Sequence, residues 1–275
     1  MRIPLTIIIP AKHEEETIIP TLTSLAAHVR TPHRIIVINV SDTKDKTANL
    51  VRRYAITHPN VRLIRKIHPY GTFWMALSLG FRAVKHGAVV PFMADACDNP
   101  KDIDRMYAKL LQDWDVVAAS RYMKGGKKIG GPAVQSMFSW LVCSSLHALT
   151  GIPTSDVSNA FKMYKKSALE VVKVNPASGV EASMEVILHA YFNGMKITEI
   201  PTIWKGRAKG YSKFNMLERT PRYLKVYIWA ILTTLSTSFS VISGKNGRDK
   251  TSRERASATG KSPRRYPRWA NARVK

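Results

Sequence analysis

Cysteine is scarce in this chain, and its scarcity excludes the small disulfide-rich class of protein. Only Cys97 and Cys143 occur among 275 residues. Two thiols cannot build the set of disulfides that holds a small secreted domain together, and they fit a reducing compartment. We therefore expect a fold held by its apolar core. At this length the chain can bury one large core or two small ones.

Long apolar runs are also missing. The run at residues 5–9 is too short for a secretion signal and stops at Pro10. Residues 226–242 carry no formal charge, but six Thr and Ser hydroxyls dilute them, and a bilayer span needs about 20 apolar residues. Basic residues precede this run: Arg219, Arg222 and Lys225. We expect an amphipathic, membrane-associated helix over residues 221–243, with an ordinary buried helix as the alternative.

Acidic side chains are few compared with basic ones. The chain has 19 Asp and Glu against 43 Lys and Arg, a formal net charge of +24. Such a chain favours anionic partners: phosphate groups, acidic lipids or nucleic acid. Residues 244–275 hold 11 of the basic residues and two acidic ones. This segment has too little apolar content to fold alone, so we expect a disordered basic tail.

What the sequence does contain is a regular alternation of apolar runs with amphipathic segments. The runs predict strands at residues 5–9, 34–40, 61–65, 89–93, 116–120, 160–164 and 197–204. The segments predict helices at residues 47–55, 73–85, 134–149 and 181–192, after a first helix opened by Glu14, Glu15 and Glu16. This alternation predicts an α/β fold with a mostly parallel sheet flanked by helices.

Ligands of such sheets bind beyond the carboxyl ends of the strands, where the polar runs lie. Asp95 and Asp98 follow the fourth predicted strand. Two carboxylates close together suit Mg²⁺, which commonly takes one or two carboxylates plus substrate phosphates. The alternative is that Asp98 only caps the following helix. Asp95 is harder to explain as a cap.

A second candidate segment is the basic stretch after residue 204. Arg207 and Lys213 lie there, near Lys205 and Lys209. A departing diphosphate needs positive charge where its own charge develops, and Arg and Lys supply it. The alternative is a mobile, solvated basic loop, the common role of a run of charges.

Several segments in one order resemble a known family. They are residues 7–15, 35–47, 93–103, 115–122, 156–162, 181–185 and 204–214. The third reads Met-Ala-Asp-Ala-Cys-Asp-Asn-Pro, and the fourth reads Asp-Val-Val-Ala-Ala-Ser-Arg-Tyr. Together they resemble a family 2 glycosyltransferase of the GT-A (Rossmann-like) fold, in the branch of dolichyl- and polyprenyl-phosphate sugar synthases. The resemblance covers about residues 3–230.

This resemblance implies a set of site residues. Asp95 and Asp98 would hold Mg²⁺ or Mn²⁺ on the donor diphosphate, although Asp-x-x-Asp replaces the usual Asp-x-Asp and leaves the ligand assignment open. Catalysis by inversion would rest on Asp98, Arg207 and Lys213, which stabilise the departing nucleoside diphosphate. Residues that would bind the nucleotide-sugar are Pro10, Ala11, Lys12, Glu14, Asp42, Asp95, Arg121, Ser139 and Ser212. Within this set, Arg121 and Ser139 would face the donor or the acceptor phosphate.

Two positions depart from the family pattern. Asn39 and its neighbour stand where the turn after the second strand usually begins with two Asp, so Asp42 or Asp45 would substitute. Gln135 stands where an Arg is expected four residues before Ser139. The first departure affects residues that would recognise the nucleobase. The second affects a residue that would contact the acceptor phosphate.

The acceptor and the location follow from the resemblance and the charge. A polyprenyl or dolichyl phosphate is already a nucleophile, whereas a sugar hydroxyl needs a general base, and no base stands out. We therefore expect a polyprenyl phosphate or glycolipid acceptor, with transfer to a sugar hydroxyl as the alternative. The basic surface predicts an enzyme peripheral to the cytoplasmic face of an anionic membrane. The expected domains are 1–220 for the transferase, 221–243 for the membrane helix and 244–275 for the tail.

Two other functions stay open at this level. The net charge of +24, with Tyr266 and Trp269 among arginines, would also suit a nucleic-acid-binding protein acting through the tail. The departures at Asn39 and Gln135 would suit a transferase-like fold that has lost activity.

Overall fold

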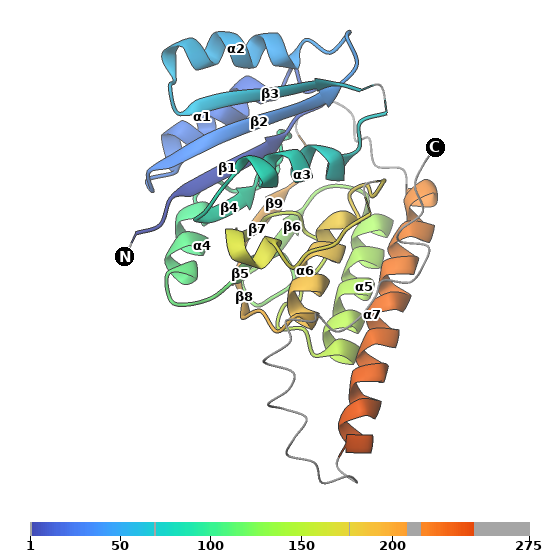
Figure 1. Ribbon diagram of the computed structural model, residues 1–275. Helices are drawn as coiled ribbons and strands as arrows, with labels where there is room; N and C mark the ends of the chain where they lie inside the picture. Colours follow the sequence, from blue (N-terminus) through green and yellow to red (C-terminus); the bar gives the residue numbers. More distant parts are fainter. Residues whose placement is uncertain (1, 69, 176, 208–215, 245–275) are drawn as a thin grey trace.

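The computed structural model describes residues 2–68, 70–175, 177–207 and 216–244, the last with side chains over 219–237. Figure 1 shows a central sheet with helices packed on both faces. The sheet has seven strands in the order β3-β2-β1-β4-β7-β5-β8. These strands are β1 (Leu5–Pro10), β2 (His33–Ser41), β3 (Val61–Ile67), β4 (Ala88–Pro91), β5 (Val116–Ser120), β7 (Lys162–Lys165) and β8 (Ile197–Pro201). The helices are α1 (Ile18–His28), α2 (Thr47–Thr57), α3 (Phe73–Ala83), α4 (Asp102–Leu110), α5 (Ala133–Thr150), α6 (Ala182–Phe192) and α7 (Met216–Gly244), with a 3-10 turn, η1, at Lys166–Leu169.

The predicted mostly parallel α/β sheet is confirmed. Strands β3, β2, β1 and β4 pair in parallel, and so do β5 and β8. One strand, β7, runs antiparallel between β4 and β5. All six residues of β1 are buried, as expected of a central strand that is covered by helices on both sides.

The apolar core lies in two layers, one on each face of the sheet. Ile8 belongs to the layer shared with α3, α5, α6 and α7, whereas Ile7 and Ile9 belong to the layer shared with α1, α2 and α4. Successive side chains of a strand point to opposite faces, so one β-branched run serves both layers. This is why the strand segments are apolar throughout rather than alternating.

The first helix begins later than the sequence predicts. Helix α1 starts at Ile18, and Glu14 to Glu16 form a turn before it in which the Glu14 carbonyl accepts a hydrogen bond from the Ile18 N–H. The expectation that these acids open the helix is therefore wrong. The turn leaves the Glu14 side chain available to a distant partner, described below.

The segment predicted as one strand at residues 197–204 is two strands. Strand β8 ends at Pro201, and β9 (Ile203–Lys205) pairs in parallel with β6 (Lys127–Ile129) in a separate ribbon. Thr202 makes the corner: its N–H donates to the Ser120 carbonyl, and its hydroxyl donates to Asp102 at 2.7 Å. From their glycines and lysines, residues 125–132 would be expected to form a flexible basic loop, but residues 127–129 form β6.

Helix α7 is longer than the predicted segment and packs beside α5 (Figure 1). Val226 and Ala230 are buried in the core. Among the described residues, no helix has both the length and the apolar character that crossing a bilayer requires.

Candidate functional site

Residues 95–98, called here the acidic turn, follow β4. They lie at the end of the sheet where the parallel strands reach their carboxyl ends. Within it the Cys97 N–H donates to an Asp95 carboxylate oxygen at 3.2 Å. Ala96 between them has a φ of 56°, in the left-handed region that a residue with a Cβ adopts at a cost of about 1 kcal/mol. Such backbone strain concentrates at functional sites, because only a surrounding structure that fixes the turn maintains it.

Asp98 is buried, with 6% of its surface exposed, and its Oδ1 atom has no hydrogen-bond partner among the residues that the structure describes. Burial and the neighbouring Asp95 charge raise the pKa of Asp98 to about 8, although Arg121 opposes the shift. Helix α4 is preceded by Lys101 as its N-cap, so the alternative in which Asp98 caps that helix is wrong. A buried carboxylate oxygen without a partner fits the needs of a divalent cation, which favours the charged form.

Arg207 lies against this turn. Its guanidinium makes a two-pronged contact with Glu14, at 3.0 and 3.2 Å, and lies 3.6 Å from Asp95 Oδ2. Burial opposes the charge, but the Glu14 hydrogen bonds and both carboxylates raise the pKa of Arg207. The solvated-loop alternative is therefore wrong for Arg207.

The ribbon of β6 and β9 holds this contact in place. The Lys205 N–H donates to the Cys97 carbonyl at 2.9 Å, and the Gly206 N–H donates to the Ile129 carbonyl at 2.7 Å. The backbone leading to Arg207 is thus fixed on the acidic turn. Lys213 and Ser212 lie outside the described residues.

The predicted donor residues after β1 form the neighbouring edge of the site. Pro10 and Ala11 are buried, and the Ala11 N–H donates to the Ile38 carbonyl of β2 at 2.9 Å. The Lys12 ammonium reaches the Gly71 carbonyl at 3.4 Å. His13 has a φ of 50°, a second left-handed residue at this edge.

Asp42 and Asp45, left as alternatives by the sequence, take different positions. Asp45 is 2% exposed, and its oxygens accept hydrogen bonds from the backbone N–H groups of His13 and Thr47 and from the Asn39 amide. Burial opposes its charge, but these bonds lower the pKa of Asp45. Asp45 thus joins the loop after β1 to the start of α2. Asp42 is more exposed and lies 3.0 Å from the His13 ring nitrogen Nε2, and the hydrogen bond lowers the pKa of Asp42.

One group of side chains has the spacing of a metal site among the described residues. Ligand atoms of His13, Glu15 and Asp45 lie within 4.8 Å of one another. Asp45 already accepts hydrogen bonds through both oxygens from protein groups. These bonds account for its burial, so the orphaned Asp98 oxygen is the stronger indication of a cation.

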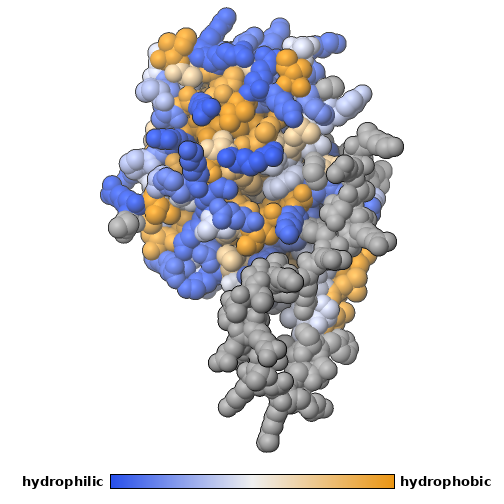
Figure 2. Space-filling model, in the orientation of Figure 1, coloured by the Kyte–Doolittle hydropathy of each residue, from blue (hydrophilic) through white to orange (hydrophobic). Residues whose placement is uncertain are grey.

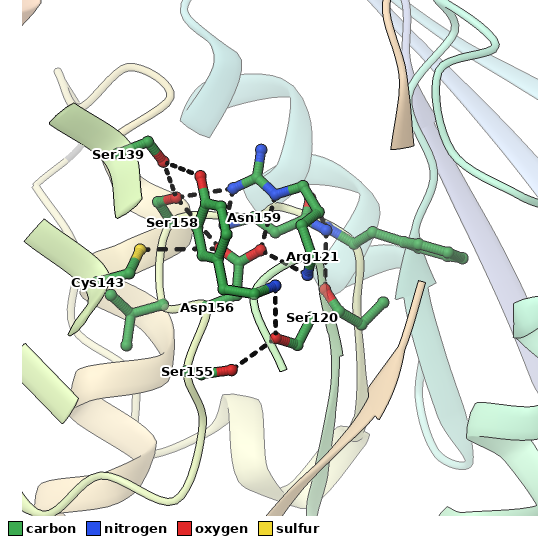
Figure 3. Close-up of polar contacts among 12 residues, drawn as sticks. Ser120, Arg121, Ser139, Cys143, Ser155, Asp156, Ser158 and Asn159 are labelled. Carbon is green, nitrogen blue, oxygen red and sulfur yellow. Dashed lines mark hydrogen bonds and ion pairs between the residues drawn. The ribbon is translucent and has the colours of Figure 1, made fainter. Parts of the chain in front are cut away.

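Arg121 and Ser139 belong to a buried polar cluster (Figure 3). The Arg121 Nε and Nη2 atoms donate to the two oxygens of Asp156 at 2.7 and 2.9 Å, and Nη2 also donates to the Ser158 hydroxyl. The Tyr122 hydroxyl donates to Ser139 at 2.8 Å, and Ser139 lies 3.0 Å from the Ser158 hydroxyl. The cluster fixes Arg121 and ties α5 to the loop before β7. Arg121 Nη1 makes no hydrogen bond within the described part of the chain.

Asp156 and Lys162 were not predicted as site residues. Lys162 is fully buried, and its ammonium donates to the carbonyls of Val157, at 3.0 Å, and Asn159. Burial lowers the pKa of Lys162 to about 8, although Asp156 opposes the shift. The segment 156–162 was recognised as part of the family pattern, but nothing in its residue types shows that Asp156 would meet Arg121 across 35 positions.

Comparison with known proteins decides the family. The family model described as Glycosyl transferase family 2 matches residues 6–173, more than half of the chain. The chain belongs to this family. It is therefore a glycosyltransferase, as the sequence segments predict.

Curated relatives of this family 2 glycosyltransferase include sugar transferases to lipid phosphates. A dolichol-phosphate mannosyltransferase from Pyrococcus furiosus is 26% identical over 212 residues, which cover 76% of this chain and 59% of the relative. The chain thus spans less than two thirds of that relative's length. A polyprenol monophosphomannose synthase from Mycolicibacterium smegmatis is 22% identical over 242 residues, which cover 86% of this chain and 90% of the relative.

Solved structures share the fold. Glucosyl-3-phosphoglycerate synthase from Mycobacterium tuberculosis, in a complex with Mn²⁺, UDP and glucosyl-3-phosphoglycerate, has a TM-score of 0.62 at 17% identity. The match covers 83% of this chain and 80% of that one. The GT-A type of fold expected from the sequence is confirmed.

Proposed function

We propose that this chain transfers a sugar, with inversion, from a GDP- or UDP-sugar to the phosphate of a polyprenyl or dolichyl carrier. The observation that carries the donor side is the contact of Arg207 with Asp95, next to the buried Asp98, whose Oδ1 atom has no hydrogen-bond partner among the described residues. The relatives named as dolichol- and polyprenol-phosphate mannose transferases support the acceptor class.

On the donor side, Asp98 and Asp95 would hold Mg²⁺ or Mn²⁺ against the diphosphate. The cation, when bound, neutralises charge on the leaving diphosphate. Arg207 is held by Glu14 and Asp95. A diphosphate offers the same bidentate geometry as these carboxylates. Arg207 would therefore exchange carboxylate for phosphate oxygens and stabilise the charge that develops as the sugar leaves.

On the acceptor side, a phosphate oxygen attacks the anomeric carbon as the bond to the diphosphate oxygen breaks. The phosphate is already anionic, so no side chain has to remove a proton. The chain has to orient that oxygen within reach of the sugar. Arg121 is fixed by Asp156 and presents its remaining nitrogen, Nη1, which suits it to this task.

A membrane surface is the natural place for such an acceptor, and two helices suit docking to it. Exposed apolar side chains follow the helical repeat on the outer faces of α5 and α7; they are Val134, Met137, Phe138 and Leu141 on α5, and Leu224, Ile228, Leu232 and Leu235 on α7. Hydrophobic colour is visible in Figure 2 at the lower right edge, where Figure 1 places these helices. With Arg222 and Lys225 nearby, we propose that this face lies on an anionic bilayer.

The test is transfer of labelled sugar from a panel of GDP- and UDP-hexoses, with Mn²⁺ or Mg²⁺, to three acceptors: farnesyl phosphate, farnesol and a free hexose. The proposal predicts product with farnesyl phosphate alone. Product with the hexose alone would instead favour transfer to a sugar hydroxyl. Absence of both transfer and donor hydrolysis with every donor would contradict the proposal and favour an inactive transferase fold.

A further inference from the structure

Lys128 is a cation that the function described so far does not use. It is the middle residue of β6, paired in register with Trp204 of β9. Its two strand neighbours, Lys127 and Ile129, are exposed, whereas Lys128 is half-buried. The alternation of a strand thus turns Lys128 to the inner side of the ribbon.

The surroundings of Lys128 are built around its side chain. Its ammonium lies 5.2 Å from the centre of the Trp204 ring, a cation–π contact. Gly131, with a φ of 79°, lies so close that a Cβ at that position would be 3.5 Å from the Trp204 ring and 3.9 Å from the Lys128 stem. Within the described residues, no hydrogen bond or ion pair of the Lys128 ammonium is found.

The charged groups near Lys128 do not neutralise its positive charge. Burial, and next the positive charge of Arg121, lower the pKa of Lys128, while Asp156 opposes the shift. Among the described residues whose charge shifts the pKa of Lys128, Asp156 is the one anion, and both of its oxygens already accept hydrogen bonds from Arg121. Arg121 and Asp156 neutralise one another, so Lys128 leaves this part of the site with an excess positive charge. A bound anion would stabilise the charged form of this partly buried ammonium.

The position of this excess charge indicates which anion would bind. The ribbon that carries Lys128 is joined to the acidic turn by the Lys205–Cys97 hydrogen bond. The Arg121 cluster beside it is joined to α5 through Ser139, and the opposite face of α5 carries the exposed apolar side chains. An anion at Lys128 therefore lies between the donor side and the helix that we assign to the lipid surface.

We propose that Lys128, together with Nη1 of Arg121, binds the phosphate of the lipid acceptor. This rests on the proposed function, because that function supplies the phosphate. Lys128 is the specificity-determining cation: it selects a phosphomonoester over an alcohol and has no part in holding the donor diphosphate.

The test compares Lys128→Met, which keeps the stem on Trp204 and removes the charge, with Lys128→Arg and with Lys127→Met as the matched variant on the outer side of the strand. Steady-state kinetics give KM for farnesyl phosphate and KM for the donor. A lost charge-assisted hydrogen bond predicts that Lys128→Met raises KM for farnesyl phosphate tenfold or more, about 1.4 kcal/mol for each factor of ten. KM for the donor stays within about twofold, Lys128→Arg recovers most of the loss, and Lys127→Met behaves as wild type. Equal increases in both KM values, or no increase, would overturn the inference.

A binding experiment separates this inference from the proposed function. Farnesyl phosphate and farnesol are titrated into the wild type and Lys128→Met by calorimetry, without donor. Weaker binding of farnesyl phosphate alone to Lys128→Met supports the anion site, even for an enzyme that transfers no sugar to it. Equal weakening of farnesol binding assigns Lys128 to packing and overturns the inference, as does unchanged binding of both. If the wild type binds farnesyl phosphate but transfers sugar only to a hydroxyl, the proposed function fails while the anion site stands.

Discussion

Arg207 joins two loops that lie far apart in the sequence. In the structure its guanidinium joins Glu14 and Asp95, and so it holds together two loops that are 193 and 112 positions away in sequence. A diphosphate would replace these partners and meet the charge of Arg207 as its own charge develops. The contact with Glu14 and Asp95 thus fixes Arg207 beside the acidic turn, where the proposed reaction would need a cation.

We predict that Arg207→Ala lowers kcat by about 10²–10³, the loss typical of one group that stabilises developing charge, and raises the donor dissociation constant by less than about tenfold. Lys205→Ala, on the neighbouring exposed side chain, is the control and should change neither value much. Single-turnover kinetics and calorimetry with the intact donor measure the two effects. A loss confined to donor affinity would contradict the assigned role.

Lys162 predicts a pH dependence of stability. Burial lowers its folded pKa to about 8 from 10.5, so between these pH values the unfolded chain binds one more proton than the folded chain. The free energy of unfolding of the wild type should therefore rise, relative to Lys162→Met, as pH increases from about 8 to 10.5. Urea titrations of both proteins across this range measure the difference. A difference that stays constant with pH would show that Lys162 titrates normally.

Among the helices and strands, the sequence predicts best those that a local pattern of apolar residues determines. Apolar runs with turn residues on either side predict the ends of β1, β2 and β5 to within one residue. The reason is that a strand covered on both faces has to be apolar at each position. The ribbon of β6 and β9 was missed, since strands of three residues with exposed lysines carry no such pattern. The antiparallel direction of β7 is set by its neighbours β4 and β5 rather than by its own residues.

The residues of the candidate site likewise fall into those that the sequence predicts and those that only the structure identifies. Asp95, Asp98 and Arg207 were identifiable from residue type and family order, and the structure brings Asp95 and Arg207 together. The Arg121–Asp156 pair and the different positions of Asp42 and Asp45 depend on contacts between distant segments. No spacing along the chain contains that information, so these roles had to come from the coordinates.

The outer faces of α5 and α7 predict behaviour on membranes. Leu141→Glu on α5 and Ile228→Glu on α7 should each weaken binding to phosphatidylglycerol vesicles about tenfold or more, since each removes an apolar side chain worth roughly 1.5–3 kcal/mol when buried. Ile56→Glu on α2 is the control, because Ile56 is 82% exposed and lies on a helix distant from α5 and α7 in Figure 1. Cosedimentation measures the three variants. Equal losses for all three would show that charge alone, and not this face, determines binding.

In the whole molecule, the sheet, the ribbon of β6 and β9 and the two outer helices α5 and α7 lie in different places. In the proposed reaction, each would contact a different component: the donor, the acceptor phosphate and the bilayer. The residues that we propose bind the donor follow the carboxyl ends of β1, β2 and β4. The ribbon links these residues to Lys128 and to the Arg121 cluster. Helix α5 contributes to that cluster through Ser139 and exposes apolar side chains on its other face. In the proposed function, this order would place the lipid phosphate between the nucleotide and the bilayer.

We propose that the buried Asp98 carboxylate binds a divalent cation that holds the nucleoside diphosphate. Calorimetric titration of GDP and UDP, with Mn²⁺ and with EDTA, into the wild type, Asp98→Asn and the surface control Asp113→Asn tests this role of Asp98. We expect Mn²⁺ to tighten binding of one nucleotide at least tenfold in the wild type and in Asp113→Asn, and we expect Asp98→Asn to lose this metal dependence. Binding that depends on Mn²⁺ equally in all three proteins would show that Asp98 does not hold the cation.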